Sequence, residues 1–154
     1  MATYTLLHNH DASIRKPGSG SQIQESDILT MLQDIPDRMF FDMDGVLVDL
    51  PRDPGIVYRD KSYHWWCELG QTALFNKLAE HKDLLKVVSW PCNHLCYKGK
   101  CTWLQGRGID HHSQAVFTKS KWLLSGPGRV LVDDYDFNCQ QWAAYGGVAI
   151  WVQP

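Results

Sequence analysis

The sequence predicts an α/β fold in which a mainly parallel, Rossmann-like sheet of five strands is flanked by helices. The strand-like apolar runs are continuous rather than alternating, which is typical of strands buried on both faces. Helical patterns lie between these runs, and a regular alternation of strand and helix favours a parallel sheet. The predicted strands are Met39–Phe41, Leu84–Val88, Ala115–Phe117, Val130–Val132 and Val148–Val152.

The chain before the first strand forms an N-terminal extension over residues 1–37. We expect residues 1–25 to be loosely organised. A short helix follows, which Ser26 would cap and Pro36 would end. Its apolar side consists of Ile28, Leu29, Leu32 and Ile35. Residues 38–154 then form the main domain.

Three further helices are predicted between the strands. The longest spans Tyr63–His81 and carries apolar residues at helical spacing. The two shorter ones are Lys98–Gln105 and Asn138–Tyr145.

Composition excludes several classes of protein. The 154 residues suffice for one domain with a real core, and 44% hydrophobic with 21% charged residues exclude a disordered or fibrous chain. The net charge of −2 disfavours a strongly basic nucleic-acid-binding protein. Acids gather in Glu25–Asp53 and bases in Leu95–Arg129, a distribution that suits a metal-assisted site for an anion.

Three features favour a cytoplasmic location without membrane contact. The longest nearly apolar stretch, Trp142–Val152, is too short to cross a bilayer. The first residues lack the charged and long apolar segments of a signal peptide, so we expect none. The five cysteines are an odd number, which indicates reduced thiols.

Polar and charged residues follow four of the predicted strands. Carboxylates follow the first strand (Asp42 and Asp44) and the fourth (Asp133 and Asp134). A hydroxyl, that of Ser89, ends the second strand, and the ammonium groups of Lys119 and Lys121 follow the third. Because ligands bind beyond the carboxyl ends of parallel strands, we expect these side chains to face one site. Carboxylates ligate Mg²⁺, hydroxyl and ammonium groups hold phosphate oxygens, and a remaining aspartate can attack phosphorus.

The same residues resemble a known series of motifs. Asp42–Asp49 resembles motif I (DxDGVLxD) of the haloacid dehalogenase superfamily, and Ser89 matches the Ser/Thr of motif II. Lys121 matches the motif III lysine, and Asp133–Asp134 matches the acidic pair of motif IV, in the same order along the chain. Three segments are similar to the 5′(3′)-deoxyribonucleotidase branch, especially its small phage and bacterial members: Lys98–Leu104, Lys121–Gly128 and Val130–Gly147.

The resemblance implies a Mg²⁺-dependent phosphomonoesterase that hydrolyses (deoxy)nucleoside monophosphates through an aspartyl-phosphate. It implies that Asp42 is the nucleophile and that Asp44 first protonates the leaving oxygen and then activates water. Ser89 and Lys121 would hold the phosphoryl oxygens. The implied Mg²⁺ ligands are the Asp42 side chain, the Asp44 carbonyl and Asp134, with Asp133 in contact through water.

The chain departs from larger members of this branch between Asp42 and Ser89. That stretch is too short for a large cap domain, so we expect a reduced cap, or flap, over about residues 50–82. Loss of cap closure weakens nucleoside selection and water exclusion. Weaker candidates for substrate binding, through base stacking or charge, are Tyr63, Trp65, Lys98 and Lys119.

Other interpretations stay open. An open site could accept phosphorylated nucleic-acid ends or another macromolecular phosphate. Alternatively, the fold could be a binding module whose extension engages a protein partner. Tyr63 and Trp65 could belong to the core instead of contacting a base. Potential zinc ligands have a spacing unlike the usual paired arrangement, so reduced cysteines beside a helix are favoured; they are Cys92, His94, Cys96 and Cys101. If a phage encodes the chain, the cytoplasm is that of its host.

Overall fold

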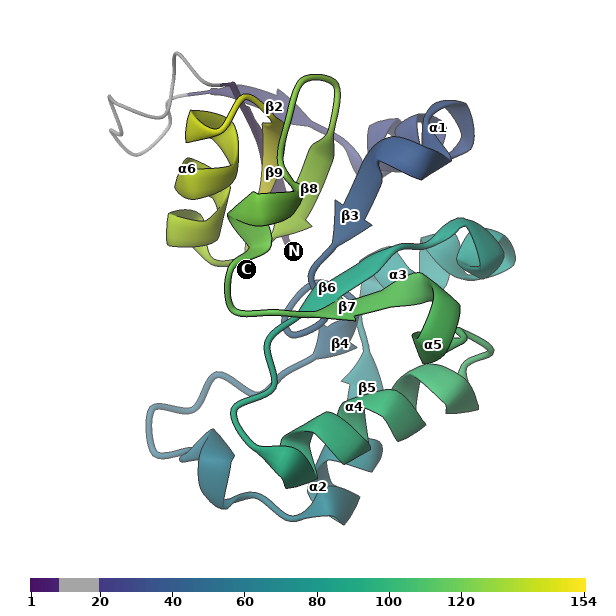
Figure 1. Ribbon diagram of the computed structural model, residues 1–154, viewed down its shortest axis with the longest axis vertical. Coiled ribbons are helices and arrows are strands. Elements are labelled where there is room, and N and C mark those ends of the chain that lie inside the picture. Colours follow the sequence, from purple (N-terminus) through teal and green to yellow (C-terminus); the bar gives the residue numbers. More distant parts are fainter. Residues whose placement is uncertain (9–19) are drawn as a thin grey trace.

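The computed structural model describes residues 1–8 and 20–154 and contains a seven-stranded sheet flanked by helices (Figure 1). The strand order is β2-β1-β9-β8-β3-β6-β7. The predicted α/β class is confirmed. The strands are β1 (Thr3–Leu7), β2 (Ser21–Ile23), β3 (Met39–Phe41), β6 (Val87–Ser89), β7 (Ala115–Phe117), β8 (Val130–Asp133) and β9 (Val148–Gln153).

The five predicted strands correspond to β3, β6, β7, β8 and β9, which lie together in the sheet and run parallel. Successive residues of β3, β6, β8 and β9 enter different cores, whereas Val116 of the edge strand β7 is exposed. Phe41 and Val132 pack into one core, whereas Phe40 and Leu131 pack into the other. Burial on both faces therefore accounts for the continuous apolar runs in the sequence.

The predicted number of strands is wrong because the N-terminal chain adds two more. β1 pairs antiparallel with β9, from Thr3 opposite Gln153 to Leu7 opposite Ala149, and β2 pairs antiparallel with β1. This pairing satisfies backbone groups that β9 would otherwise leave free at a sheet edge. The expectation of a loosely organised start therefore fails for β1 and β2, while residues 9–19 lie outside the described residues.

Helix α1 (Glu25–Asp34) confirms the short predicted helix, but Gln24 rather than Ser26 occupies its N-cap position. The Gln24 backbone N–H donates to Asp27 Oδ2 at 2.7 Å, which satisfies one of the free amides at the helix start. The buried residues Ile28 and Leu32 are one helical turn apart, as expected for a face that packs on a core.

Helices cover both faces of the sheet. α1, α3 (Ala73–Leu78) and α4 (His94–Gly106) contribute to one core, and α6 (Asp136–Ala144) contributes to the other (Figure 1). The shorter α5 (His111–Gln114) leads into β7. Trp103 of α4 and Trp142 of α6 are the largest fully buried side chains of the two cores.

The predicted long helix Tyr63–His81 is wrong. The segment contains a short helix, a strand, a second helix and a 3₁₀ segment, which are α2 (Tyr63–Cys67), β5 (Gly70–Gln71), α3 and Ala79–Leu84. β5 forms a separate two-stranded antiparallel sheet with β4 (Val48–Asp49).

Contacts from α4 explain why this segment does not continue as one helix. The Leu69 carbonyl accepts hydrogen bonds from Trp103 Nε1 at 2.8 Å and from Arg107 Nη2 at 3.1 Å. Thr72 then starts α3, because its Oγ1 accepts from the Phe75 backbone N–H at 3.1 Å. Tertiary hydrogen bonds and a new helix cap therefore override the helical period of the sequence.

The absence of a side chain at Gly99 lets α2 pack directly on α4. A Cβ at this position would collide with Trp66, which is buried on α2. α2 is therefore held against α4, and Figure 1 shows the two helices side by side.

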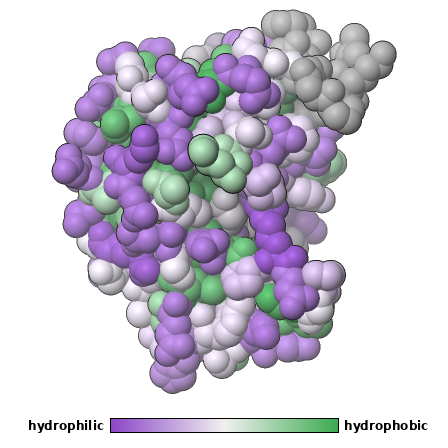
Figure 2. Space-filling model, turned by 180° about the vertical axis from the view of Figure 1, so that it is seen from behind, coloured by the Kyte–Doolittle hydropathy of each residue, from purple (hydrophilic) through white to green (hydrophobic). Residues whose placement is uncertain are grey.

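The surface seen from behind is mostly hydrophilic, with hydrophobic residues in small separate groups (Figure 2). No helix among the described residues combines the length and apolar character needed to span a membrane. All five cysteines are free thiols.

Candidate active site

The site lies at β3, the point where the order of the parallel strands reverses. The chain passes from β3 to β6 and β7 on one side, and then to β8 and β9 on the other. Such a switch point opens a crevice at the carboxyl end of the strands. Asp42 follows β3 at this point, and its backbone N–H donates to the Val132 carbonyl of β8 at 2.8 Å. The sheet itself therefore positions the first aspartate.

Asp42, Asp133 and Asp134 each bring a carboxylate oxygen within 4.8 Å of the others. Asp133 is completely buried, and its Oδ1 accepts from the Tyr135 backbone N–H at 2.8 Å. Its Oδ2 accepts from Asn138 Nδ2 at 3.1 Å. Asp133 is thus held on both oxygens, whereas the Asp134 side chain is 18% exposed.

Lys121 joins the two buried carboxylates of this cluster. Its Nζ donates to Asp42 Oδ1 at 2.5 Å and to Asp133 Oδ2 at 2.7 Å. Burial lowers the pKa of Lys121, but the two carboxylates raise it further, so the net shift is upward. The side chain therefore stays an ammonium ion at the base of the site.

Lys100 is a second buried ammonium that the sequence prediction missed. Its Nζ donates to Asp44 Oδ2 at 2.5 Å and to Ser89 Oγ at 2.8 Å, and only 1% of the residue is exposed. A signal was present, since Lys100 shares helical spacing with Cys96 and Leu104, both buried on α4. A lysine on the buried face of a helix needs an anionic partner.

Asp44 is mostly buried but differs from the other aspartates in its partner. Burial raises its pKa, and the charge of Lys100 opposes this effect without cancelling it. Its Oδ1 is buried and accepts no hydrogen bond among the described residues. Asp44 therefore has one oxygen fixed by Lys100 and one that has no hydrogen-bond partner among the described residues.

The carboxylates outnumber the buried cations, which favours an added cation. Burial raises the pKa of Asp133 to about 6 and that of Asp134 to about 7, with Asp42 adding to both shifts. Arg52 offsets part of the Asp134 charge through a 2.6 Å ion pair, but its side chain is 47% exposed. Asp42, Asp133 and Asp134 offer carboxylate oxygens that could together hold a metal ion.

A glycine turn brings the loop after β3 close to Asp134. Gly45 has a φ of +77°, which side-chain-bearing residues rarely adopt. A Cβ there would also collide with the Asp134 carboxylate. The glycine of the motif thus allows the turn and leaves room for the second acidic pair.

The structure contains a cavity of about 360 Å³, and some of the sequence-predicted residues line it whereas others do not. The residues that line it include five predicted ones, namely Asp42, Asp44, Ser89, Lys119 and Lys121. Asp133 and Asp134 do not line the cavity, but their carboxylates lie within 4.8 Å of that of Asp42, which does. The structure does not bring Tyr63, Trp65 or Lys98 to the cavity.

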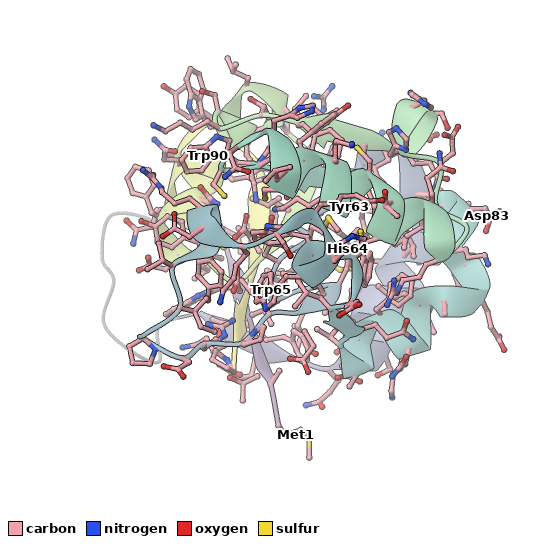
Figure 3. The ribbon with its side chains drawn as sticks, turned by 90° about the horizontal axis from the view of Figure 1, so that it is seen from below. Met1, Tyr63, His64, Trp65, Asp83 and Trp90 are labelled. Atoms are coloured by element: carbon pink, nitrogen blue, oxygen red, sulfur yellow. The ribbon has the colours of Figure 1, made fainter. Side chains whose placement is uncertain are left out.

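These three residues have other partners. Tyr63 Oη lies 3.0 Å from Thr102 Oγ1, and the Lys98 ammonium lies over the Tyr63 ring at 5.3 Å. Trp65 packs edge-on against Trp66 with ring centroids 5.0 Å apart. Tyr63, His64 and Trp65, all on α2, are labelled in Figure 3 together with Trp90, which directly follows β6 and lines the cavity.

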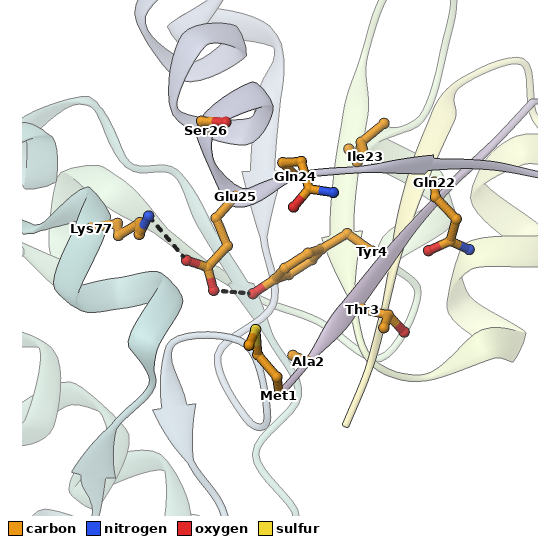
Figure 4. A pocket seen from close by; sticks show the side chains of 10 residues that line it. All are labelled: Met1, Ala2, Thr3, Tyr4, Gln22, Ile23, Gln24, Glu25, Ser26 and Lys77. Atoms are coloured by element: carbon orange, nitrogen blue, oxygen red, sulfur yellow. Dashed lines mark hydrogen bonds and ion pairs between the residues drawn. The ribbon is translucent and has the colours of Figure 1, made fainter.

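A second cavity of about 420 Å³ lies beside the N-terminal strands and shares no lining residue with the first (Figure 4). Tyr4 Oη donates to Glu25 Oε1 at 2.9 Å, and Lys77 Nζ lies 3.6 Å from Glu25 Oε2. These contacts tie β1 to α1 and α3. Because Tyr4, Glu25 and Lys77 pair with one another across this cavity, we assign it a structural role.

Among the described residues, one group of three or more potential ligands is close enough to share a metal ion, and it consists of Asp42, Asp133 and Asp134. No family model, curated protein or solved structure matches the chain. The function is therefore inferred from the geometry of the site itself.

Proposed function

We propose that this protein is a Mg²⁺-dependent phosphomonoesterase of the haloacid dehalogenase superfamily, with nucleotide phosphomonoesters as substrates. One observation carries the proposal. A nucleophile candidate, Asp42, and an acid–base candidate, Asp44, face the same cavity and are each paired with a different buried lysine. A nucleophile and a separately tuned proton donor are what the two-step hydrolysis of a phosphate ester requires.

Asp42, Asp133 and Asp134 are the residues that would hold the metal ion. When bound, Mg²⁺ supplies charge neutralisation for the phosphoryl oxygens. Asp134 suits direct ligation, because both oxygens of Asp133 already accept hydrogen bonds, whereas the exposed Arg52 pairs with one oxygen of Asp134, Oδ2. This difference supports the predicted roles of the acidic pair.

In the first step, an Asp42 oxygen attacks phosphorus and the bond from phosphorus to the leaving oxygen breaks. Asp44 gives its proton to that oxygen, so an alcohol leaves and an aspartyl-phosphate remains. In the second step, Asp44 takes a proton from water, the water oxygen attacks phosphorus, and the bond to Asp42 breaks. The raised pKa of Asp44 suits a group that must hold a proton before the reaction.

The two lysines have separate tasks in this proposal. Lys121 holds Asp42 in place and contributes positive charge where negative charge develops. Lys100 fixes the orientation of Asp44 and also reaches Ser89, so it links the acid to the predicted phosphate-binding hydroxyl. Lys100 is therefore a positioning residue for Asp44.

The presence of Asp44 favours phosphoester chemistry because an alkoxide leaving group needs a proton donor. Nucleoside monophosphates are the first substrates to test, as the sequence motifs predict. Phosphorylated nucleic-acid ends are the second, since no residue between Gly45 and Val88 lines the cavity among the described residues.

Phosphate release from a panel of compounds tests the proposal. The panel holds 5′- and 3′-mononucleotides, a phosphorylated oligonucleotide, a cyclic dinucleotide and glycerol phosphate, each with Mg²⁺ or with chelator. We expect metal-dependent release that Asp42→Asn abolishes. Absence of release from every compound by folded protein with Mg²⁺ would instead favour a binding module.

A further inference from the structure

Three aromatic rings at the mouth of the cavity have no role in the chemistry proposed above. Trp90, Tyr135 and Phe137 line the same cavity as Asp42 and Lys121. Yet they remain 52%, 59% and 51% exposed, respectively. Exposed aromatic residues beside a polar cavity are a feature of binding surfaces, because a protein gains nothing from leaving such rings in water.

The three rings stand on either side of the nucleophile. Trp90 directly follows β6, whereas Tyr135 and Phe137 follow β8, and β3 with Asp42 lies between these strands. The Tyr135 and Phe137 ring centroids are 6.0 Å apart and tilted by 45°. We refer to Trp90, Tyr135 and Phe137 as the aromatic rim.

An exposed cation accompanies the rim. Lys119 Nζ lies over the Trp90 ring, 5.1 Å from its centroid, and Lys119 also lines the cavity. An ammonium beside an aromatic face offers one contact for a phosphodiester and one for a base.

Among the described residues, no residue of the flap lines the cavity. The flap's aromatic residues Tyr58, Trp65 and Trp66 pack on one another, and α2 is held on α4. A small ligand in an enclosed pocket has most of its surface buried. Here the rings that face the ligand are half exposed, so the site suits a ligand that continues from the cavity into solvent.

We propose that the aromatic rim and Lys119 bind the terminal nucleotides of a single-stranded nucleic acid, whose end phosphate enters the cavity. This inference rests on the proposed phosphomonoesterase function and narrows its substrate. The rings stack on unpaired bases, and Lys119 meets a following phosphodiester. Hydrolysis breaks the bond from phosphorus to the terminal sugar oxygen, and water supplies the oxygen to phosphate and the proton to the new terminal hydroxyl.

The net charge of −2 limits how far the contact extends. Long tracts of nucleic acid are bound through many basic contacts, which raise affinity at low salt. This chain offers one exposed lysine at the cavity itself, so the rim engages a few nucleotides rather than a long strand.

The test compares kcat/KM on four substrates. They are a single-stranded oligothymidylate of about four nucleotides with a 5′- or 3′-phosphate, a blunt-ended DNA hairpin that carries the same terminal phosphate on a base-paired end, thymidine 5′-monophosphate, and glycerol phosphate. We expect the single-stranded end to exceed both the hairpin and the mononucleotide by roughly 5-fold or more, as expected for one added stacking contact.

Rim variants test the named residues. Trp90→Ala and Tyr135→Ala should each lower kcat/KM on the single-stranded end by about 5- to 100-fold, the range for one base stack. The loss on glycerol phosphate should be smaller, and Tyr135→Phe should retain the ring and the activity. Tyr145→Ala is the matched control, because Tyr145 is 56% exposed but stacks on Trp122 and does not line the cavity.

If the rim variants lose activity equally on all substrates, the rim has a structural role and the proposal is overturned. Faster hydrolysis of the mononucleotide than of the single-stranded end would also overturn it. Binding is measured separately, by fluorescence anisotropy of a labelled phosphorylated oligothymidylate with Asp42→Asn and its Trp90→Ala double variant. Hydrolysis of glycerol phosphate without rim-dependent binding overturns this inference alone. Absence of hydrolysis from all substrates overturns the proposed function, and the binding measurement then decides the rim by itself.

Discussion

The strand ends and the flap, residues 50–82, are neighbouring regions that are built in different ways. At the ends of β3, β6 and β8, the positions of Asp42, Ser89 and Asp133 follow directly from the parallel sheet. In the flap, Trp66 takes its place from packing against α4, and β5 from pairing with β4. The proposed catalytic residues therefore lie at the ends of the parallel strands, whereas the flap packs on α4, the helix that carries Lys100.

The largest expected effect is at Asp42. Asp42→Asn should lower kcat by about 10⁴-fold or more, as for loss of other enzymatic nucleophiles. The variant should stay folded, because Lys121 keeps its contact with Asp133 and the cluster loses one negative charge. Phosphate release measures activity, and circular dichroism checks the fold. A loss below about 10-fold in a folded variant would exclude Asp42 as the nucleophile.

Lys100→Met tests the link from α4 to the strand ends. Without the ammonium, the pKa of Asp44 should rise further, because burial already raises it and Lys100 opposes that effect. We expect kcat to fall by roughly 10²-fold, within the range for a misplaced general acid. The pH–rate profile should also move to higher pH. A loss of stability with an unchanged profile would show that Lys100 only supports the fold.

Stability without metal should depend on pH through the acidic cluster. The raised pKa values of Asp133 and Asp134, about 6 and about 7, mean that the folded state binds protons more tightly than the unfolded chain. Their contribution is therefore full below about pH 4, the value for an unfolded aspartate, and is lost as pH rises through 6 to 7. We expect the free energy of unfolding to fall by on the order of 1–3 kcal/mol.

Urea unfolding at several pH values with chelator measures this fall, and Mg²⁺ above pH 7 should restore stability by binding the folded state. Asp134→Asn serves as the control, since it should flatten the profile and weaken the response to Mg²⁺. If the wild-type protein and Asp134→Asn show the same dependence of stability on pH, repulsion among the buried carboxylates does not limit stability.

The smallest expected effect is in the flap. Trp65→Ala should change kcat/KM by less than about 3-fold, while stability falls by about 1 kcal/mol through loss of its ring contacts. Steady-state kinetics and thermal unfolding measure the two quantities. A large loss of activity that is confined to nucleotide substrates would show that Trp65 binds substrate. The flap, like the strand ends, would then contribute to the active site.

The same contrast explains which parts could be predicted from the sequence. Five strands, and the acidic ends of two of them, were predictable, because burial on both faces and charge after an apolar run are local patterns. The pairing of β1 with β9 was not, since it joins residues at opposite ends of the chain. Lys100 was missed because its partners, Asp44 and Ser89, become neighbours only when α4 packs beside the strand ends.

The central claim is that Asp42 forms a covalent phosphoryl intermediate while Asp44 handles the protons. Rapid quenching of turnover with borohydride tests it, because this reagent reduces an acyl phosphate to an alcohol and so converts the modified aspartate to homoserine. Peptide mass spectrometry then locates the change. We predict homoserine at position 42, dependent on both substrate and Mg²⁺. Steady turnover with no trapped residue, or with reduction at another carboxylate, would contradict the assignment of Asp42.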